Sequence, residues 1–411
     1  MSLSAFIAKR IAFNRERTFS RFIIRIAVTA TALSVAIMIL ATALINGFQQ
    51  VVSQKVFSFC GHIHITRFQP NAGPLTEELP FSVNDTLERE ITAIPAVKDF
   101  NRYATKSAII KSPDEIEGVI FKGVDADYHW EYLQQFITQG SILHFPDSGY
   151  SQEIIVSEYL ARELNLKLHD RLLVYFIQNA GEPPRVRRLN VAGLYKTSIE
   201  DYDKTFVIGD INLLRKLNNW QENEVGGYEI VLHDYRQMDS VNNLIYDHYL
   251  PDRLASQTIR EIYPNIFDWL NLQNMNERII LIIMIIVAII NMVTAILILI
   301  LERTNMVGIL KSLGMPNRSI QRIFIYQAGY IMLAGVLLGN VLGLGLAYLQ
   351  KATGFFKLPE DIYYMPVAPI LLKYWQVALI DAGTLVLCIF VLLIPSLLVR
   401  SISPVKAIRF K

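Results

Sequence analysis

The amino-acid sequence predicts an α-helical membrane protein with four spans and one large α+β domain outside the membrane. The chain of 411 residues is 52% hydrophobic and only 18% charged, which is unusual for a soluble protein. Its apolar residues concentrate in four blocks, at residues 22–46, 279–301, 323–349 and 377–399. Each block has about the 20 residues that cross roughly 30 Å of hydrocarbon. The second block carries no charge and only Asn291 and Thr294 as polar residues, which excludes a buried helix of a soluble protein.

Lysines and arginines near the block ends predict the orientation of the spans, because such residues collect on the cytoplasmic side. They lie before the first block, between the second and third, and after the fourth: Lys9, Arg10, Arg15, Arg17, Arg21, Arg303, Lys311, Arg318, Arg322, Arg400, Lys406, Arg409 and Lys411. Both termini are therefore expected in the cytoplasm, together with the loop 302–322 and the tail 400–411. Residues 47–278 and the short connection 350–376 are expected outside.

The segment before the first block, residues 1–21, mixes apolar and basic side chains. Phe6 and Ile7 are followed closely by Lys9 and Arg10. This pattern is typical of an amphipathic helix that lies on the inner membrane surface. A helix packed against cytoplasmic protein is the alternative. The first block is too long for the apolar region of a cleavable signal peptide, so we expect it to remain as a span.

The external segment 47–278 has the pattern of a mixed α and β domain with helical stalks. Strand patterns occur at residues 61–68, 108–110, 117–123, 171–178, 185–195 and 227–234, and a strand followed by a helix is expected at 153–166 and at 205–217. Turn residues at 179–184 predict a hairpin between the strands on either side. Helices are expected at 84–94, capped by Asn84 or Asp85, and at 240–250, while Asp210 caps the helix of the second strand–helix pair.

The loop 302–322 carries an apolar run, residues 306–310, among charged residues. A loop between spans needs no buried face of its own, so this run predicts a soluble partner that docks from the cytoplasmic side. Gly308 lets such a partner approach closely, and Leu313-Gly314 is a typical helix end. A re-entrant turn in the lipid headgroups is the alternative.

Small residues recur in the third block at Gly335, Gly339 and Gly343. A four-residue spacing of glycines lets two helix backbones approach closely. We expect this stripe to pack against span two or four of the same subunit. Pro395 in the fourth block removes a helical hydrogen bond and is expected to kink that span.

No catalytic constellation is visible in the sequence, which argues against an enzyme. The chain has no nucleotide-binding Gly-x-x-x-x-Gly-Lys-Ser/Thr motif and no Cys-pair or His-Glu-x-x-His metal spacing. His62 and His64 lie on one face of a strand and could ligate a metal, but no third ligand is near them in the sequence, so we expect them to form a polar face of an exposed strand. Cys60 and Cys388 allow no disulfide framework. The formal net charge of +2 gives no argument for nucleic acid as a partner.

Two stretches of the last third resemble the FtsX-domain ABC permeases, over residues 275–405. They are the Glu-Arg-Thr, Gly-Ile-Leu and Leu-Gly pattern that begins at Glu302, and the terminal Pro-x-x-Ala-Leu-Arg element at 404–409, with Ile408 at the Leu position. The resemblance implies that ATP and Mg²⁺ bind a separate ATPase and that no cofactor binds this chain. The residues implied to couple the two chains are Glu302, Arg303, Met306, Val307, Gly308, Ile309, Leu310, Leu313 and Gly314.

Three further stretches are similar to the LolC/LolE lipoprotein-releasing group. They are the start with the Asn-Gly-Phe at 46–48, the external stretch LPEDIYYMPV at 358–367, and part of the external domain at 153–176 and 190–208, which includes the triplet Asp201–Asp203. The resemblance implies a MacB/LolCDE-type permease: four transmembrane helices with both termini in the cytoplasm and a large α+β periplasmic domain. It also implies a multi-pass protein of a Gram-negative inner membrane that extracts lipoproteins.

The same resemblance implies the partners. These are a LolD-like ATPase, a second permease that is identical or homologous, a lipoprotein and a periplasmic carrier. Cargo would enter laterally between span one of one subunit and span two of the other, along Ala41, Leu44, Ile45, Phe48, Ile279, Ile282, Ile283 and Ile286. The hairpin implied to dock the carrier corresponds to Gln178, Pro183, Pro184 and Arg187.

This hairpin is shorter than in the LolC group. A LolE-like partner, a single subunit with both roles, and a permease for another cargo all stay open. The alternatives from other classes are a MacB-like efflux permease and an FtsX-like signalling permease that controls envelope hydrolases. The external segment 47–278 is longer than is usual for the signalling type.

Overall fold

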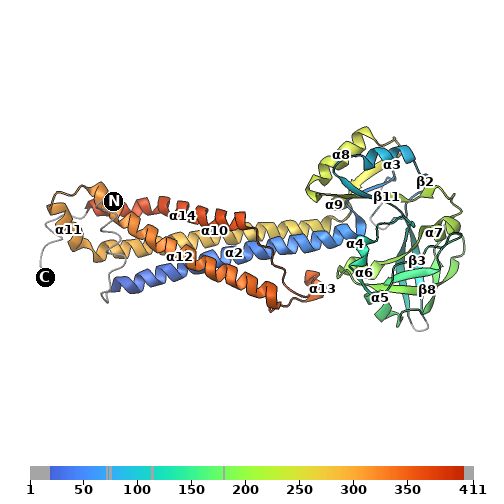
Figure 1. The fold of residues 1–411 in the computed structure, drawn as a ribbon, viewed down its shortest axis with the longest axis horizontal. Coiled ribbons are helices and arrows are strands. Elements are labelled where there is room, and N and C mark those ends of the chain that lie inside the picture. The colour runs from blue at the N-terminus through green and yellow to red at the C-terminus, as the bar shows by residue number, and fades with distance from the viewer. Residues whose placement is uncertain (1–18, 71–72, 74–75, 113–114, 179–180, 402–411) are drawn as a thin grey trace. The chain divides into compact units, whose positions relative to one another are not determined.

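A computed structural model describes residues 19–70, 73, 76–112, 115–178 and 181–401 of the chain (Figure 1). Residues 1–18 of the expected amphipathic helix at 1–21 and most of the tail at 400–411 therefore lie outside the described residues. The chain divides into two compact bodies. The membrane body contains Met1–Gln50, Leu270–Lys357 and Val367–Lys411, and the external body contains Val51–Trp269 and Leu358–Pro366.

The membrane body is built from long apolar helices. Among the described residues, four segments are long and apolar enough to cross a membrane: Phe22–Cys60, Pro264–Glu302, Asn317–Thr353 and Tyr374–Arg400. They belong to helices α2 (Phe19–Cys60), α10 (Pro264–Glu302), α12 (Asn317–Thr353) and α14 (Tyr374–Ser396), with η2 (Leu397–Ser401) after α14. The α-helical part of the last span ends at Ser396, one residue after Pro395, and the 3-10 helix η2 follows directly.

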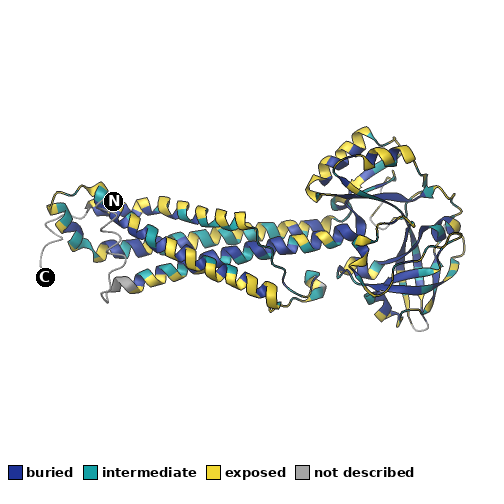
Figure 2. Cartoon of the chain, in the orientation of Figure 1, coloured by how far each residue is buried: buried dark blue, intermediate teal, exposed yellow. Residues whose placement is uncertain are grey.

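Buried apolar side chains from all four helices form the core of this body, among them Val35, Met292, Phe324 and Cys388. Figure 2 shows that the remaining helix surfaces carry many exposed residues. Helix α10 exposes several large apolar side chains, including Ile282 and Ile290. Such exposure suits contact with lipid, because lipid tails are as apolar as the side chains themselves.

The glycine stripe of α12 packs against α2. A Cβ atom added at Gly335 would lie 2.8 Å from the Cβ of Thr31, and one added at Gly339 would lie 2.7 Å from the Cβ of Val35. At Gly343 the nearest atom is the Cα of Ala36, at 3.1 Å. The expectation that the stripe faces span two or four was wrong. The small side chains of α2 at these heights offer the closest backbone approach, and sequence spacing alone does not show which helix supplies them.

The external body is built on one large mixed sheet. Its strands are β1 (Ile63–Arg67), β3 (Val97–Lys111), β4 (Ile116–Val124), β5 (Ile137–Gly140), β6 (Glu153–Ser157), β7 (Arg171–Phe176), β8 (Arg185–Tyr195), β9 (Phe206–Asp210), β11 (Gly227–Leu232) and β12 (Leu254–Thr258). They lie in the order β12-β1-β11-β3-β4-β9-β6-β8-β5, and β7 pairs with β3 and β8. The pairs β4–β9 and β6–β8 are parallel and the others are antiparallel. A small second sheet joins β2 (Phe81–Ser82) to β10 (Glu224–Val225).

Short helices accompany the sheet of the external body. They are α3 (Asp85–Thr92), α4 (Glu131–Gln134), α5 (Glu158–Glu163), α6 (Glu200–Thr205), α7 (Ile211–Asn218), η1 (Tyr235–Gln237), α8 (Met238–His248), α9 (Ile259–Ile262) and α13 (Glu360–Tyr363). The predicted caps are confirmed: the Asn84 side chain accepts from the N–H groups of Thr86 and Leu87, and Asp210 accepts from Asn212. Both caps depend on neighbours in sequence, which is why local pattern finds them.

The predicted hairpin is also confirmed, since β7 and β8 pair antiparallel with Tyr175 opposite Val186. Strand β3, by contrast, begins at Val97, well before the predicted residues 108–110. Its first half carries Lys98, Asp99 and Arg102, which weaken the strand pattern. Pairing with β11 decides the structure there, and tertiary context commonly overrides strand propensity in this way.

Candidate functional site

Helix α11 (Thr304–Ser312) forms the centre of the expected coupling loop. The helix ends where the sequence predicts, at Leu313-Gly314. Gly314 takes φ +82°, its N–H donates to the carbonyl of Lys311 at 3.0 Å, and the N–H of Met315 donates to that of Leu310 at 3.0 Å. This Schellman motif needs a left-handed residue that glycine adopts without strain, so it fixes the boundary of the helix.

The side chains of α11 separate into a buried and an exposed set. Val307 and Gly308 are buried, and Val307 belongs to the core of the membrane body. Ile309 is 53% exposed and Leu313 is 78% exposed. Residues four apart share one face of a helix, so Ile309 and Leu313 form an outward apolar face, and the exposed polar side chain of Asn305 lies one turn earlier on the same side.

The other predicted coupling residues lie around this face. Glu302 and Gly314 are exposed, whereas Arg303, Met306 and Leu310 are half-buried. Met306 and Leu310 pack against the core of the membrane body. The sequence could not separate outward from inward positions in the run, because all of its residues except Gly308 are large and apolar.

The residues predicted to line a lateral cavity behave differently on the two helices. On α10, Ile279, Ile282, Ile283 and Ile286 are exposed. On α2, Ala41 and Leu44 are half-buried, while Ile45 and Phe48 are buried. The α10 residues therefore form a surface open to lipid or to another molecule, and the α2 residues turn partly into their own bundle.

The predicted carrier hairpin is the β7–β8 connection. Pro183 and Pro184 are exposed, and Gln178 and Arg187 are half-buried. The amide of Gln178 donates to the carbonyl of Phe176 at 3.2 Å. Arg187 donates to the adjacent carbonyl of Val186 at 2.9 Å.

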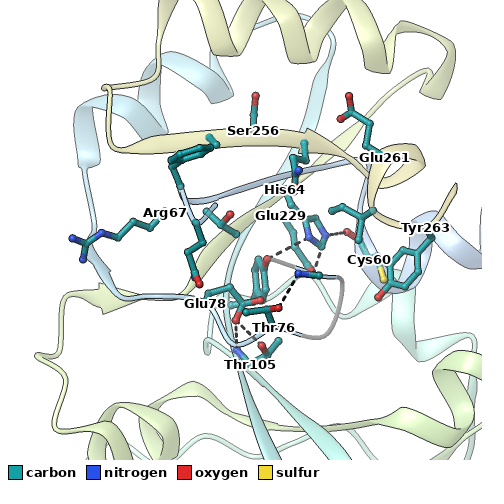
Figure 3. A pocket seen from close by; sticks show the side chains of 18 of the residues that line it. Cys60, His64, Arg67, Thr76, Glu78, Thr105, Glu229, Ser256, Glu261 and Tyr263 are labelled. Atoms are coloured by element: carbon teal, nitrogen blue, oxygen red, sulfur yellow. Dashed lines mark hydrogen bonds and ion pairs between the residues drawn. The ribbon is translucent and has the colours of Figure 1, made fainter. Parts of the chain in front are cut away.

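A cavity of about 560 Å³ lies inside the external body (Figure 3). Its lining includes an ion pair that the sequence analysis missed: Lys122 Nζ lies 2.7 Å from Glu229 Oε1, and each side chain is only 3% exposed. Burial disfavours the charge of Lys122, but Glu229 prevails and raises the pKa of the lysine. Lys122 also donates to the carbonyl of Phe59 at 2.7 Å. A charged residue within each of two apolar strands, EGVIFKGV and GYEIVL, is the signal that could have found this pair.

His62, directly before β1, and His64, within β1, both lie in the interior of the external body. The expectation of an exposed polar face was therefore wrong. His64 donates from Nε2 to the carbonyl of Cys60 at 2.5 Å and accepts from the hydroxyl of Tyr103 at Nδ1, at 3.3 Å. His62 accepts from the N–H of Leu232 at 3.1 Å. Burial lowers the pKa of both rings, that of His62 to about 4. Strand β1 is enclosed by β11 and β12, a long-range arrangement that its own sequence does not show.

The described lining of the cavity identifies neither a metal nor a reaction. The described residues contain no group of three or more His, Cys, Asp or Glu that could hold a metal ion. Glu78, on its wall, accepts from the N–H and the hydroxyl of Thr105 at 2.9 and 2.5 Å. The charged groups of the cavity wall thus bind one another or the backbone, which stabilises the fold of the external body.

Comparison with known proteins finds two matching families. Residues 26–245, more than half of the chain, match the MacB-like periplasmic core domain, and residues 278–404 match the FtsX-like permease C-terminal domain. The chain belongs to the FtsX/MacB-type ABC transporter permeases. Permeases of this family are non-catalytic transmembrane subunits, and the family implies a partner ATPase. The four apolar helices and the α+β domain between the first two spans agree with this assignment.

Several relatives of this permease match along its whole length at low identity. It is 23% identical to the lipoprotein-releasing system transmembrane protein LolC of Neisseria meningitidis, over 100% of both chains. It is 22% identical to LolC of Xylella fastidiosa, over 97% of this chain and 96% of that one. It is 21% identical to LolE of Haemophilus influenzae, over 92% of both. These organisms are Gram-negative bacteria.

A solved structure of the periplasmic region of MacB from Actinobacillus actinomycetemcomitans matches this permease with a TM-score of 0.34 and 12% identity. The match covers 50% of this chain and 92% of that one. The extracellular domain of the transporter YknZ from Gram-positive bacteria matches with a TM-score of 0.31 and 16% identity, over 48% of this chain and 99% of that one.

Proposed function

We propose that this permease releases lipoproteins from the inner membrane of a Gram-negative bacterium toward a periplasmic carrier. The observation that carries the proposal is the end-to-end match to LolC and LolE proteins, which includes the membrane helices and the external domain alike. Lipoprotein release also has a physical need for such a machine. Each buried CH₂ group of an acyl chain stabilises membrane attachment by about 0.8 kcal/mol, so a protein with several acyl chains does not leave the bilayer unaided.

The energy in this proposal comes from a separate, LolD-like ATPase that binds ATP and Mg²⁺ and docks on α11. Exposed Ile309 and Leu313 offer the apolar contact for it. Two permease subunits, identical or homologous, complete the complex. The exposed isoleucines of α10 supply one wall of the lateral entry for acyl chains.

Depletion of the permease in its own host tests this function. Lipoproteins destined for the outer membrane should accumulate in the inner-membrane fraction, and restored expression should return them. The distribution of an outer-membrane β-barrel protein serves as the control, because it carries no acyl anchor. Normal delivery of lipoproteins after depletion would rule the proposal out.

A second candidate is a MacB-like permease that moves another cargo. The short β7–β8 hairpin favours it, since the hairpin keeps Pro183 and Pro184 but little else of the longer loop of the LolC group. The depletion experiment separates the two functions, because an efflux permease leaves lipoprotein distribution unchanged.

A further inference from the structure

Two stretches that resemble the LolC/LolE group contact each other in the external body. One contains Asp203, in the loop and short helix α6 that follow β8. The other is Leu358–Pro366, which contains α13 and joins spans three and four along the chain but belongs to the external body. Lys196 Nζ lies 2.8 Å from Glu360 Oε2, and the hydroxyl of Ser198 donates to Glu360 Oε1 at 2.6 Å. Both oxygens of the Glu360 carboxylate are therefore engaged by the β8–β9 connection.

Asp203 gives this connection its shape. One carboxylate oxygen accepts from the N–H and the hydroxyl of Thr197, at 3.0 and 2.7 Å, and the other accepts from the N–H of Ser198 at 2.9 Å. Asp203 is only 7% exposed. Ser198 has φ +63°, a conformation that costs energy for a residue other than glycine. The buried carboxylate holds Ser198 in this conformation, which directs its hydroxyl to Glu360.

The other end of α13 is held as well. Lys55 donates to the carbonyl of Tyr364 at 2.7 Å. The ring of Tyr364 packs edge-on against Trp269, with the ring centroids 5.8 Å apart. Lys55 comes from α2 and Trp269 from α10, so the linker is tied to the helices of spans one and two as well as to the β8–β9 connection.

The Glu360 contact is ionic at neutral pH. Burial alone would raise the pKa of Glu360, but the hydrogen bonds from Lys196 and Ser198 outweigh it and lower the pKa. The hydrogen bond to Glu360 correspondingly raises the pKa of Lys196. The side chains of Lys196 and Glu360 are 38% and 29% exposed, and an ion pair so open to solvent contributes little to folding stability. The ion pair therefore acts mainly by fixing the position of the linker.

We propose that Glu360, held by Lys196 and Ser198, fastens the linker between spans three and four to the external domain. A displacement of α12 or α14 then reaches that domain through the linker, in addition to any route through α2 and α10. The fastening is independent of the cargo, whereas its role in transport rests on the proposed function. Asp203 is a positioning residue for Ser198.

The fastening itself is tested first, with native side chains in the intact complex. A carbodiimide joins a lysine and a carboxylate only when they are in contact, so mass spectrometry of membranes treated with it should find an amide between Lys196 and Glu360. The variant E360Q should lack that product. Absence of the product from the unaltered protein, with other contacting Lys–Glu pairs such as Lys106–Glu77 cross-linked, would overturn the proposal.

The role in transmission is tested by exchanging the charges. K196E and E360K should each reduce the lipoprotein released per ATP hydrolysed at least about fivefold, the lower range of coupling between sites. The double variant K196E/E360K restores the opposite charges and should recover release to within about twofold. The control D239K breaks the Arg260–Asp239 pair, at 2.7 Å in the same body, and should have no effect.

Two results of the exchange would overturn this role. One is unchanged release per ATP in both single variants, and the other is a double variant no better than either single one. If the unaltered complex releases no lipoprotein, the proposed function fails. The role in transmission is then decided by the change in cross-linking within the external domain when ATP is added. Loss of this ATP response in K196E, with recovery in the double variant, supports the role. An unchanged response in K196E overturns it.

Discussion

The protein should lose the most stability when only one of the two charges of the Lys122–Glu229 ion pair is removed. The variant E229Q leaves a lysine charge in an interior where its side chain is 3% exposed, without a carboxylate to balance it. We expect the free energy of unfolding of the external body to fall by about 3–5 kcal/mol. Urea unfolding of the purified protein, followed by tryptophan fluorescence, measures this change.

The matched control replaces both partners by apolar residues of similar size, as in K122M/E229L. This double variant removes the desolvation of two charges together with their attraction, so its loss of stability should be much smaller. Equal losses in the single and the double variant would contradict the role assigned to the pair.

For single residues, the sequence predicted the interactions that are made with near neighbours along the chain. Asn84 and Asp210 were recognisable as helix caps because each bonds N–H groups two or three residues away. The Lys122–Glu229 pair and the Glu360 contacts were not recognisable. Their partners come from distant strands and loops, and a charged residue in an apolar strand does not reveal its partner.

Among the elements, α12 and α2 pack through glycines whose importance can be measured. The variant G339A places a Cβ 2.7 Å from that of Val35 and 2.8 Å from the carbonyl oxygen of Ala32, so the helices must separate. We expect a loss of about 1–3 kcal/mol, as is usual for an overpacked core. Thermal unfolding in detergent should show a lower Tm.

Gly345 on the same helix is the control, because an added Cβ there meets no atom within 4 Å. G345A should leave the Tm unchanged or raise it slightly, since alanine favours helices. If both variants had the same Tm, close packing along the stripe would be disproved.

Helix α11, the predicted docking site for the ATPase, permits a similarly local test. I309E places a charge on its exposed apolar face, where an ATPase would have to bury it, so co-purification of the ATPase should fall at least about tenfold. I309L keeps the side chain apolar and should retain binding. Charges at Val307 are a poor test, because that side chain is buried in the permease itself. Undiminished co-purification with I309E would exclude this face as the docking site.

Element identity was predictable where the pattern was long or strongly periodic. The four apolar blocks correspond to α2, α10, α12 and α14, and the β7–β8 hairpin was visible from its turn residues. Strand β12, with the sequence LASQT, was missed because small polar residues give no strand pattern. Its pairing with β1 decides its conformation.

For the molecule as a whole, charge and hydropathy predicted the division into spans and one external domain, because both follow from bulk preferences for lipid and water. They did not predict that Leu358–Pro366 would belong to the external body, since it lies between two spans along the chain. That assignment depends on particular contacts, chiefly those of Glu360 and Tyr364. The fastening of this linker follows from them.

In the proposed function, ATP hydrolysis on another chain drives lipoproteins out of the bilayer through this permease. The most direct measurement places the permease, the ATPase that co-purifies with it and a triacylated lipoprotein in liposomes, with a periplasmic carrier outside. We expect lipoprotein to appear in the soluble fraction with ATP and Mg²⁺ but not with ADP. Vigorous ATP hydrolysis with all of the lipoprotein still in the membrane would contradict it.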